Sequence, residues 1–300
     1  MVDICIIGAG TAGLSAAIYG MRAGKSVLVL EALNYGGQII NTPDIENYPG
    51  FRHISGYDFA TALYEQANRL GMQLVYDRAV GIARDKDKFT VLGNVDKYQA
   101  RTVILATGMK RRKLGIPGED KFRGMGVSYC ATCDGAFYRN RKAAVAGGGN
   151  SAFSEALYLS DFCEAVYLIH RRDTFRGEQS TLEHLKQKKN IRIIANVTML
   201  SVNGTDAVAS VSYRENATGH VHELPVDGLF VAVGSIPDTD YLDGFVALDK
   251  NGFVTADESC RTDVSGVFVA GDCRTKAVRQ LTTAAADGTV AALAACAYLK

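Results

Sequence analysis

Two stretches of the chain repeat one pattern, in which a short apolar run is followed by glycines and then by apolar residues at helical spacing. The first stretch has an apolar run at 2–7, GAGTAG at 8–13 and LSAAIYGMRAG at 14–24. A second apolar run, SVLVLE, ends at Glu31. Unbroken β-branched runs are typical of parallel strands covered on both faces, so this stretch predicts a βαβ unit.

The same order of elements begins again after residue 141. The pattern predicts a strand at 142–147, a turn at GGGNSA, a helix at 151–162 and a strand, AVYLIH, that ends at His170. Other patterned segments predict helices at 56–70 and 279–299, and strands at 73–76, 80–83, 102–108, 226–234 and 266–271. Strands alternating with helices indicate an α/β fold with parallel sheets.

Two segments without periodicity, 109–119 and 235–241, interrupt this order and predict linkers. The tail that follows contains one strong strand and one helix, which is too little for an independent domain. We therefore expect the tail to return to the first domain and complete its sheet. The expected fold is two Rossmann-like, three-layer dinucleotide-binding domains with the second inserted into the first. Their ranges are 1–112 with 239–300, and 113–238.

Composition excludes several classes of protein. The 300 residues carry 33 Lys plus Arg and 32 Asp plus Glu, a net charge of +1 that argues against a nucleic-acid partner. No run of 18 apolar residues exists, so no membrane partner is expected. Seven cysteines, an odd number with only one close pair, and no evident signal peptide predict a cytoplasmic protein.

The first glycine turn has the spacing of a dinucleotide-binding fingerprint, because GAGTAG lies between the expected strand and helix. Gly8 permits the tight turn, Gly10 lets the backbone approach a pyrophosphate, and Gly13 lets helix and strand pack closely. The free N–H groups of the helix N-terminus face that pyrophosphate. Glu31, at the end of the next strand, is placed to accept a hydrogen bond from a ribose hydroxyl.

The second glycine turn presents the opposite charge. Gly147, Gly149 and Ala152 occupy the three fingerprint positions, and HRRDTFR stands where the first unit has its acid. The basic residues of that segment are His170, Arg171, Arg172 and Arg176. Arginine suits a ribose 2′-phosphate, so this site should prefer NADP to NAD. Two dinucleotide sites in one chain predict hydride transfer between a nicotinamide and a flavin.

CATCDG places Cys130 and Cys133 two residues apart, with Asp134 beside them. This spacing is typical of a redox pair whose thiolate is stabilised near neutral pH. Half of a structural zinc site and two inert thiols are the alternatives; a zinc site needs further paired ligands that the sequence does not offer, so no metal is predicted. Asp134 is expected to relay a proton to the emerging thiol, or else to be a turn residue.

The segment GDCRTKAVRQ follows the last expected strand. Asp272 should lie where ligands bind in such sheets and contact a ribityl hydroxyl of the flavin. A helix that begins near Arg279 would direct its N-terminal dipole toward the flavin's pyrimidine edge. Gly37, within YGGQI, is expected to contact a cofactor, and Cys273 is expected to be structural.

The chain resembles the low-molecular-weight thioredoxin reductases over nearly all 300 residues. The motifs that carry the resemblance occur in the order GAGTAG, GGQI, ENYPG, ATG, CATCDG, GGGNSA, HRRDTFR and GD…RQ. The resemblance implies a homodimer with one FAD per subunit, in which NADPH passes hydride to FAD and electrons then reach the cysteine disulfide. It implies that Cys133 faces the flavin and that Cys130 attacks the disulfide of thioredoxin. Departures are small: Ile39 replaces a common Leu, and Cys273 replaces an apolar residue.

The resemblance also implies cofactor contacts. For FAD these are Gly10, Thr11, Ala12, Glu31, Gln38, Asn47, Val80, Gly108, Asp272, Arg279 and Gln280. For NADPH they are Asn150, Ser151, His170, Arg171, Arg172 and Arg176. Two other functions are compatible with the motifs: a dithiol oxidase that passes electrons to oxygen, against which HRRDTFR argues, and a nucleotide-binding redox sensor without turnover. The disulfide partner itself is not specified by the motifs.

Overall fold

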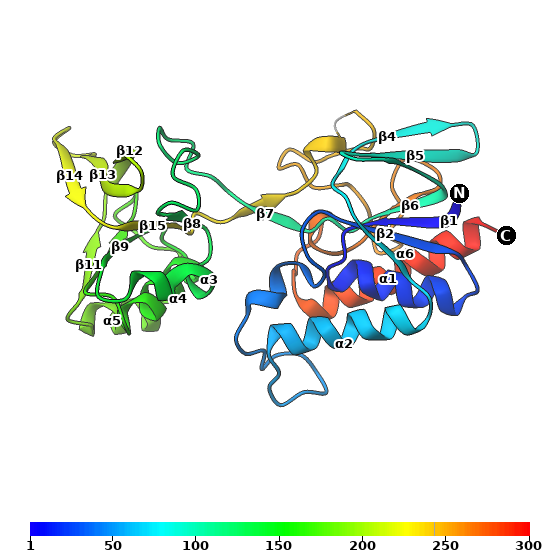
Figure 1. The fold of residues 1–300 in the computed structure, drawn as a ribbon, viewed down its shortest axis with the longest axis horizontal. Coiled ribbons are helices and arrows are strands. Elements are labelled where there is room, and N and C mark those ends of the chain that lie inside the picture. Colours follow the sequence, from blue (N-terminus) through cyan, green and yellow to red (C-terminus); the bar gives the residue numbers. More distant parts are fainter. Residues whose placement is uncertain (243) are drawn as a thin grey trace. The chain divides into compact units, whose positions relative to one another are not determined.

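The computed structural model describes residues 1–242 and 244–300, which form two compact units (Figure 1). The first unit is Met1–Lys110 with Ile236–Lys300, and the second is Arg111–Ser235. The first unit ends at 110 and resumes at 236, where the sequence suggested 112 and 239. None of the helices in the described residues has the length and apolar character that a membrane span requires.

The first unit is built on a seven-stranded sheet in the order β3-β2-β1-β6-β5-β4, with β17 pairing to β6. Its strands are β1 (Val2–Ile7), β2 (Val27–Glu31), β3 (Gln73–Tyr76), β4 (Ala79–Asp85), β5 (Lys88–Gly93), β6 (Lys97–Leu105) and β17 (Val267–Val269). Its helices are α1 (Thr11–Arg22), α2 (Gly56–Arg69) and α6 (Leu281–Tyr298), with short 3₁₀ turns η1 (Gly37–Asn41), η3 (Asp240–Leu242) and η4 (Gly271–Cys273). The returning tail thus completes the sheet through β17, which runs parallel to β6.

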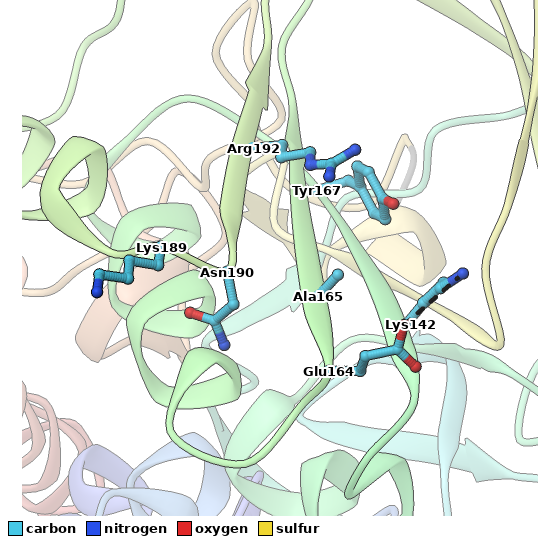
Figure 2. A pocket seen from close by; sticks show the side chains of 7 residues that line it. All are labelled: Lys142, Glu164, Ala165, Tyr167, Lys189, Asn190 and Arg192. Carbon is cyan, nitrogen blue, oxygen red and sulfur yellow. Dashed lines mark ion pairs between the residues drawn. The ribbon is translucent and has the colours of Figure 1, made fainter.

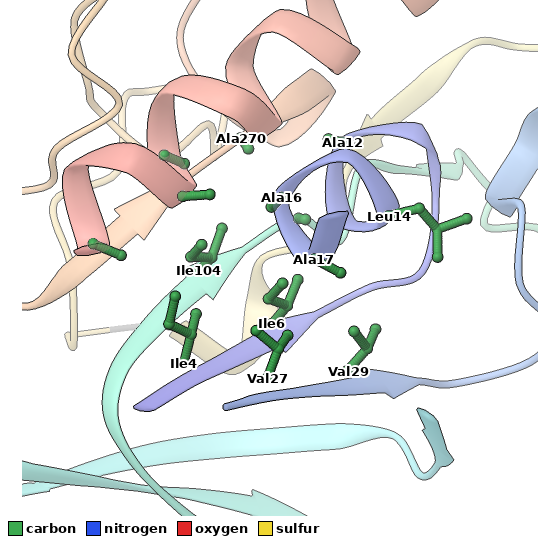
Figure 3. Close-up of a cluster of buried hydrophobic side chains, with 14 of the residues drawn as sticks. Ile4, Ile6, Ala12, Leu14, Ala16, Ala17, Val27, Val29, Ile104 and Ala270 are labelled. Carbon is green, nitrogen blue, oxygen red and sulfur yellow. The ribbon is translucent and has the colours of Figure 1, made fainter. Parts of the chain in front are cut away.

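One face of this sheet is covered by closely packed helices, as Figure 3 shows. Ile4 and Ile6 of β1, spaced two apart, point to the same side and pack with Ala16 and Ala17 of α1. Alanines there let α1 and α6 lie close together over the strands. Side chains on the other face of the strands, such as Cys5 and Ile7 of β1, pack with Phe89 of β5 and with Val246 and Val254 of the tail.

The second unit combines a parallel sheet with an antiparallel one. The parallel sheet has the order β11-β10-β9-β15-β8, and three further strands, β12-β13-β14, form the antiparallel sheet. The strands are β8 (Val127–Ser128), β9 (Lys142–Ala146), β10 (Ala165–Ile169), β11 (Ile191–Ile194), β12 (Val197–Gly204), β13 (Val208–Glu215), β14 (Val221–Pro225) and β15 (Gly228–Val231). The helices are α3 (Ala131–Asp134), α4 (Asn150–Ser160) and α5 (Gln179–Gln187), with the 3₁₀ turn η2 (Gly135–Tyr138).

The two segments expected as irregular linkers contain strands. β7 (Met109–Arg111) and β16 (Ser235–Pro237) pair as a two-stranded sheet. The expectation was wrong there because a charged segment without periodicity can still satisfy its backbone N–H and C=O groups by pairing with a neighbouring strand. Side-chain pattern carries little information in so short a strand.

The contact between α1 and α6 depends on the missing side chain of Gly288. A Cβ atom there would lie 2.1 Å from the carbonyl oxygen of Ala12, which belongs to α1 backbone and cannot swing away. Gly288→Ala should therefore lower the free energy of unfolding of the holoprotein by about 1–3 kcal/mol. Helix propensity alone would instead raise it by about 1 kcal/mol.

Denaturant unfolding of the variant measures this effect. Val290→Ala on the exposed side of the same helix is the matched control and should leave the free energy nearly unchanged. A stabilised Gly288→Ala variant would show that α1 and α6 are not in this contact.

Candidate active site

The first glycine turn closes tightly between β1 and α1. A Cβ atom on Gly13 would lie 1.8 Å from the Gly8 carbonyl oxygen, so only glycine allows the first turn of α1 to sit against the strand. Gly8 has a φ of +108°, which other residues rarely adopt. Thr11 and Ala12 begin the helix and are buried, with their backbone N–H groups at its N-terminus.

A second glycine loop runs beside this turn. Gly36 N–H donates to the Ala9 carbonyl at 2.8 Å, and Gly10 forms an isolated bridge with Gly36. Gly37, with a φ of +64°, would bring a Cβ atom to 3.2 Å from the Gly10 Cα. Two backbone segments without side chains thus line the same face, which gives a flat, polar cradle where a pyrophosphate could approach.

Glu31 is directed at the glycine turn. Its carboxylate accepts hydrogen bonds from Ala9 N–H at 2.8 Å and from Leu33 N–H at 2.9 Å. The acid is therefore fixed beside the turn, where the spacing of the motif predicts a ribose.

Asp272, in η4, is a buried acid with an unused acceptor. Its Oδ1 atom is buried and has no hydrogen-bond partner among the described residues. Burial raises the pKa of this carboxyl. An orphaned buried acceptor calls for a donor supplied from outside the chain, which a ribityl hydroxyl would provide.

A buried ionic network holds the turn that carries Asp272. Asp287 of α6 accepts hydrogen bonds from Gly271 N–H at 3.0 Å, from Arg274 at 2.9 Å and from Lys276 at 2.7 Å. Although burial alone would raise it, hydrogen bonds from the two cations keep the pKa of the Asp287 carboxyl below its usual value. Asp287 was not predicted from the sequence, in which the available signal is an acid inside an alanine-rich helix.

Other residues expected at the flavin site lie along the first unit. Asn47 donates to the Gln280 side chain at 3.3 Å, and both line a hollow of about 620 Å³. Gln280 caps α6, which begins at Leu281. Gln38 donates to the Met109 carbonyl, Val80 is exposed on β4, and Gly108 has a φ of +64°. The Arg279 guanidinium donates to two backbone carbonyls and lies 4.0 Å from the Phe253 ring centroid.

The second glycine turn repeats the close approach of helix and strand. A Cβ atom on Gly147 would lie 2.4 Å from the Ala232 carbonyl oxygen and 2.7 Å from the Cβ of Ala152. Gly149 precedes α4, which begins at Asn150 and Ser151. The carbonyl oxygen of Gly148 and the side chain of Asn150 accept hydrogen bonds from loop 170–178.

That loop carries the basic cluster. Arg171, Arg172 and Arg176 are exposed, and none forms an ion pair with a described residue. His170 stacks on Phe175 with ring centroids 4.8 Å apart. Burial and the three neighbouring arginines lower the pKa of His170. Unpaired guanidinium groups beside a glycine turn can hold a phosphate of a bound dinucleotide.

Cys130 and Cys133 form a disulfide, with Cα atoms 5.3 Å apart, at the start of α3. Cys133 N–H donates to the Cys130 sulfur at 3.2 Å. Asp134 follows directly and accepts a hydrogen bond from Ser128 Oγ at 2.6 Å. Ser128 also accepts from Cys130 N–H at 3.1 Å, so one hydroxyl links the acid to the redox pair.

The remaining cysteines are free and buried: Cys5, Cys163, Cys260, Cys273 and Cys296. The Cys273 sulfur lies 3.5 Å from the Ala270 carbonyl oxygen and 3.7 Å from that of Leu105. Burial raises the pKa of its thiol, which disfavours the reactive thiolate. In the ranges 1–242 and 244–300, no cluster of potential metal ligands occurs.

A second hollow, of about 360 Å³, lies at the opposite, amino-terminal ends of β9, β10 and β11 (Figure 2). Lys142, Lys189 and Arg192 line it. In Figure 2 the three side chains diverge, with Lys189 pointing away from the other two. Lys142 pairs with Glu164 at 3.8 Å. Cations that do not converge leave no single place for an anion.

The chain is similar to known proteins of one family over almost its whole length. The family model for pyridine nucleotide-disulphide oxidoreductases matches residues 2–288. A thioredoxin reductase of Treponema pallidum is 42% identical over 298 residues, covering 99% of this chain and 97% of that protein. The structure of Lactococcus lactis thioredoxin reductase superposes with a TM-score of 0.90 at 38% identity, covering 100% of this chain and 99% of the other. The structure of T. acidophilum thioredoxin reductase superposes with a TM-score of 0.87 at 34% identity, covering 99% of this chain and 98% of the other.

Glu155 of α4 was not identified from the sequence. Its Oε2 atom is buried without a hydrogen-bond partner among the described residues, and burial raises the pKa of the carboxyl to about 7. Because the folded pKa exceeds the ordinary value of 4.5, the folded state holds the proton more tightly than the unfolded chain. Stability should therefore decrease as pH rises from about 4.5 to 7 and then level off.

Glu155→Gln should remove this loss. The free energy of unfolding of the variant minus that of the parent protein should therefore increase with pH across that window, with a slope of at most about 1.4 kcal/mol per pH unit. Denaturant unfolding between pH 5 and 8 measures it. Glu183→Gln is the control, because Lys186 lowers the pKa of the Glu183 carboxyl, and it should give no such gain. A pH-independent difference for Glu155→Gln would contradict this assignment.

Proposed function

The chain belongs to the pyridine nucleotide-disulphide oxidoreductases and, within them, to the thioredoxin reductases, and we propose that its first unit binds FAD and its second NADPH. The family uses both cofactors. The sequence prediction places the FAD-binding domain at 1–112 with 239–300 and the NADPH-binding domain, which carries the redox pair, at 113–238; we propose that these domains correspond to the first and second units. The observation on which the proposal depends is the Cys130–Cys133 disulfide in the unit that also has the arginine-bearing loop.

FAD, when bound, supplies the two-electron couple between NADPH and the disulfide. Its proposed ligands combine the glycine cradle, the ordered carboxylate of Glu31 and the orphaned acceptor of Asp272. The buried Asp287 network supports Asp272 from behind. The full proposed set is Gly8, Gly10, Thr11, Ala12, Gly13, Glu31, Gly37, Gln38, Asn47, Val80, Gly108, Asp272, Arg279 and Gln280.

NADPH is proposed to bind at the second turn. The unpaired arginines of loop 170–178 support a ligand with a 2′-phosphate, which NADH lacks. The full proposed set is Gly147, Gly149, Asn150, Ser151, Ala152, His170, Arg171, Arg172 and Arg176. Since Asn150 already accepts from Glu178 N–H at 2.7 Å, we propose that its side chain acts through the loop.

The cysteines and Asp134 carry out disulfide exchange. In the reduced pair, the Cys130 thiolate attacks one sulfur of the thioredoxin disulfide, which forms a mixed disulfide and releases one thioredoxin thiolate. The Cys133 thiolate then attacks the Cys130 sulfur. This restores the Cys130–Cys133 disulfide and releases the second thioredoxin thiolate, so two electrons pass to thioredoxin. Asp134 gives a proton to a departing thiolate.

Thioredoxin or a similar protein is the proposed partner, since the relatives are thioredoxin reductases. A homodimer is proposed from the family resemblance, and a cytoplasmic location from the five free, buried cysteines, which suit a reducing compartment. A dithiol oxidase remains the competing enzyme. It has no use for the arginines of loop 170–178, so the reductase is the better-supported function.

Cys130→Ser should lower the rate of thioredoxin reduction by NADPH about 100-fold or more, because no mixed disulfide can form. NADPH should still bleach the visible absorption of the bound flavin, which shows that the nucleotide sites are intact. Cys163→Ala, at a free cysteine of the same unit, is the control and should keep thioredoxin turnover. Full turnover by Cys130→Ser would contradict the assigned nucleophile, and oxygen uptake with a small dithiol would favour the oxidase.

Asp134→Asn should lower the rate of thioredoxin reduction by about 100-fold, because the departing thiolate loses its proton donor. Ser128→Ala should have a smaller effect of the same sign, since Ser128 only orients the acid. Stopped-flow measurement of thioredoxin reduction, with flavin reduction by NADPH followed separately, resolves the affected step. Equal decreases in the rates of flavin reduction and of thioredoxin reduction would indicate a structural role for Asp134.

A further inference from the structure

We propose that Asn216, in the turn between β13 and β14, is a positioning residue for recognition of the 2′-phosphate of NADPH. The inference rests on the proposed role of Arg171 and Arg172. It assigns to the antiparallel sheet β12-β13-β14 a part in nucleotide selection. None of the sequence motifs lies in that sheet.

The second half of loop 170–178 is fastened to the glycine turn. Arg176 and Gly177 both donate their backbone N–H to the Gly148 carbonyl, at 2.8 and 3.2 Å. Glu178 N–H donates to Asn150 Oδ1 at 2.7 Å. These bonds position Arg176, but they do not reach the two arginines at the start of the loop.

The first half is held by the antiparallel sheet instead. Asn216 Nδ2 donates to the Arg171 carbonyl at 3.0 Å, and Asn196 N–H donates to the Arg172 carbonyl at 3.0 Å. Asn196, just before β12, has a φ of +56°, a conformation that asparagine tolerates better than most residues. The consecutive carbonyls of Arg171 and Arg172 therefore both accept hydrogen bonds from asparagines at the ends of β12 and β13.

The amide of Asn216 has a fixed orientation. Thr198 Oγ1 donates to Asn216 Oδ1 at 2.7 Å, so the NH₂ group must face the loop. Asn216 N–H also donates to the Asn196 carbonyl at 3.0 Å, which joins the two asparagines into one support. One threonine and two asparagines thus hold the backbone of Arg171 and Arg172.

Such support matters because both arginine side chains are long and exposed. Bringing two flexible side chains onto one phosphate costs conformational entropy, and a fixed backbone reduces that cost. A ligand without the 2′-phosphate does not use the pair. Loss of the Asn216 side chain should therefore weaken the binding of nucleotides that carry a 2′-phosphate and leave the binding of other nucleotides unchanged.

The test uses the FAD-loaded holoenzyme of the Asn216→Ala variant. Its dissociation constant for 2′,5′-ADP and its KM for NADPH should rise by about two- to fivefold, because its one side-chain hydrogen bond to the loop is lost. Its kcat, its affinity for 5′-AMP and its kcat/KM with NADH should stay unchanged. Thr198→Val, which frees the amide without removing it, should give a smaller change of the same sign.

Asn203→Ala is the matched control, since Asn203 donates to Ser210 and Ser212 of the same sheet and, among the described residues, its side chain forms no hydrogen bond with the loop. It should leave 2′,5′-ADP binding unchanged. Unchanged 2′,5′-ADP binding in Asn216→Ala, or equal losses for 2′,5′-ADP and 5′-AMP, would overturn the proposal. If the parent protein itself fails to distinguish these two ligands, the NADPH site is wrong and the inference falls with it.

Discussion

The absence of a side chain at a few positions determines how the first unit can be assembled. Ala12, in the first turn of α1, meets Gly271 and Gly288 from two other parts of the chain, where added Cβ atoms would lie 2.8 Å and 2.1 Å from its atoms. This contact brings together the glycine turn, the η4 turn and α6. The glycine turn, the η4 turn and the N-cap of α6 each carry proposed cofactor ligands, so the proposed flavin site depends on this close approach of the backbones.

The two units share one local arrangement but present opposite charges beside it. In each, a glycine turn joins a parallel strand to a helix, and a nearby segment beyond the next strand supplies charge. In the first unit that charge is the carboxylate of Glu31, held by backbone N–H groups. In the second it is an arginine-bearing loop whose carbonyls are held by asparagines. Backbone hydrogen bonds fix the position in both cases, and the charged side chain is what we propose to select the ribose substituent.

Much of this could be predicted from the sequence, because the relevant signals are local. The glycine spacing of 8–13 and the C-x-x-C of Cys130 and Cys133 are short motifs whose chemistry follows from neighbouring residues. The strands and helices around them also followed from periodicity. The small size of the tail likewise indicated that it returns to the first domain and completes its sheet, which the structure confirms through the pairing of β17 with β6.

What could not be predicted depends on contacts between distant residues. β7 and β16 were missed because their pairing is set by the backbone, while their charged or short sequences resemble loops. Asn216 is an ordinary turn residue until β13 and β14 bring it to Arg171, 45 residues away in sequence. Asp287 and Glu155 show a partial signal, an acid inside an apolar helix. The sequence does not tell the paired acid from the unpaired one.

The presence or absence of paired cations gives the two acids, Asp287 and Glu155, different effects on the fold. Asp287 is surrounded by Arg274 and Lys276, both almost fully buried, and its charge is compensated within the fold. Removing any member would leave an uncompensated charge, so this cluster stabilises one arrangement of η4 against α6. Glu155 has only the distant attraction of Arg111 to lower its pKa, and burial prevails. A buried carboxyl without a paired cation is costly to ionise, and it does not restrain the position of a neighbouring segment. The ionic network therefore holds η4 against α6 at the proposed flavin site, whereas Glu155 makes the stability of the fold depend on pH.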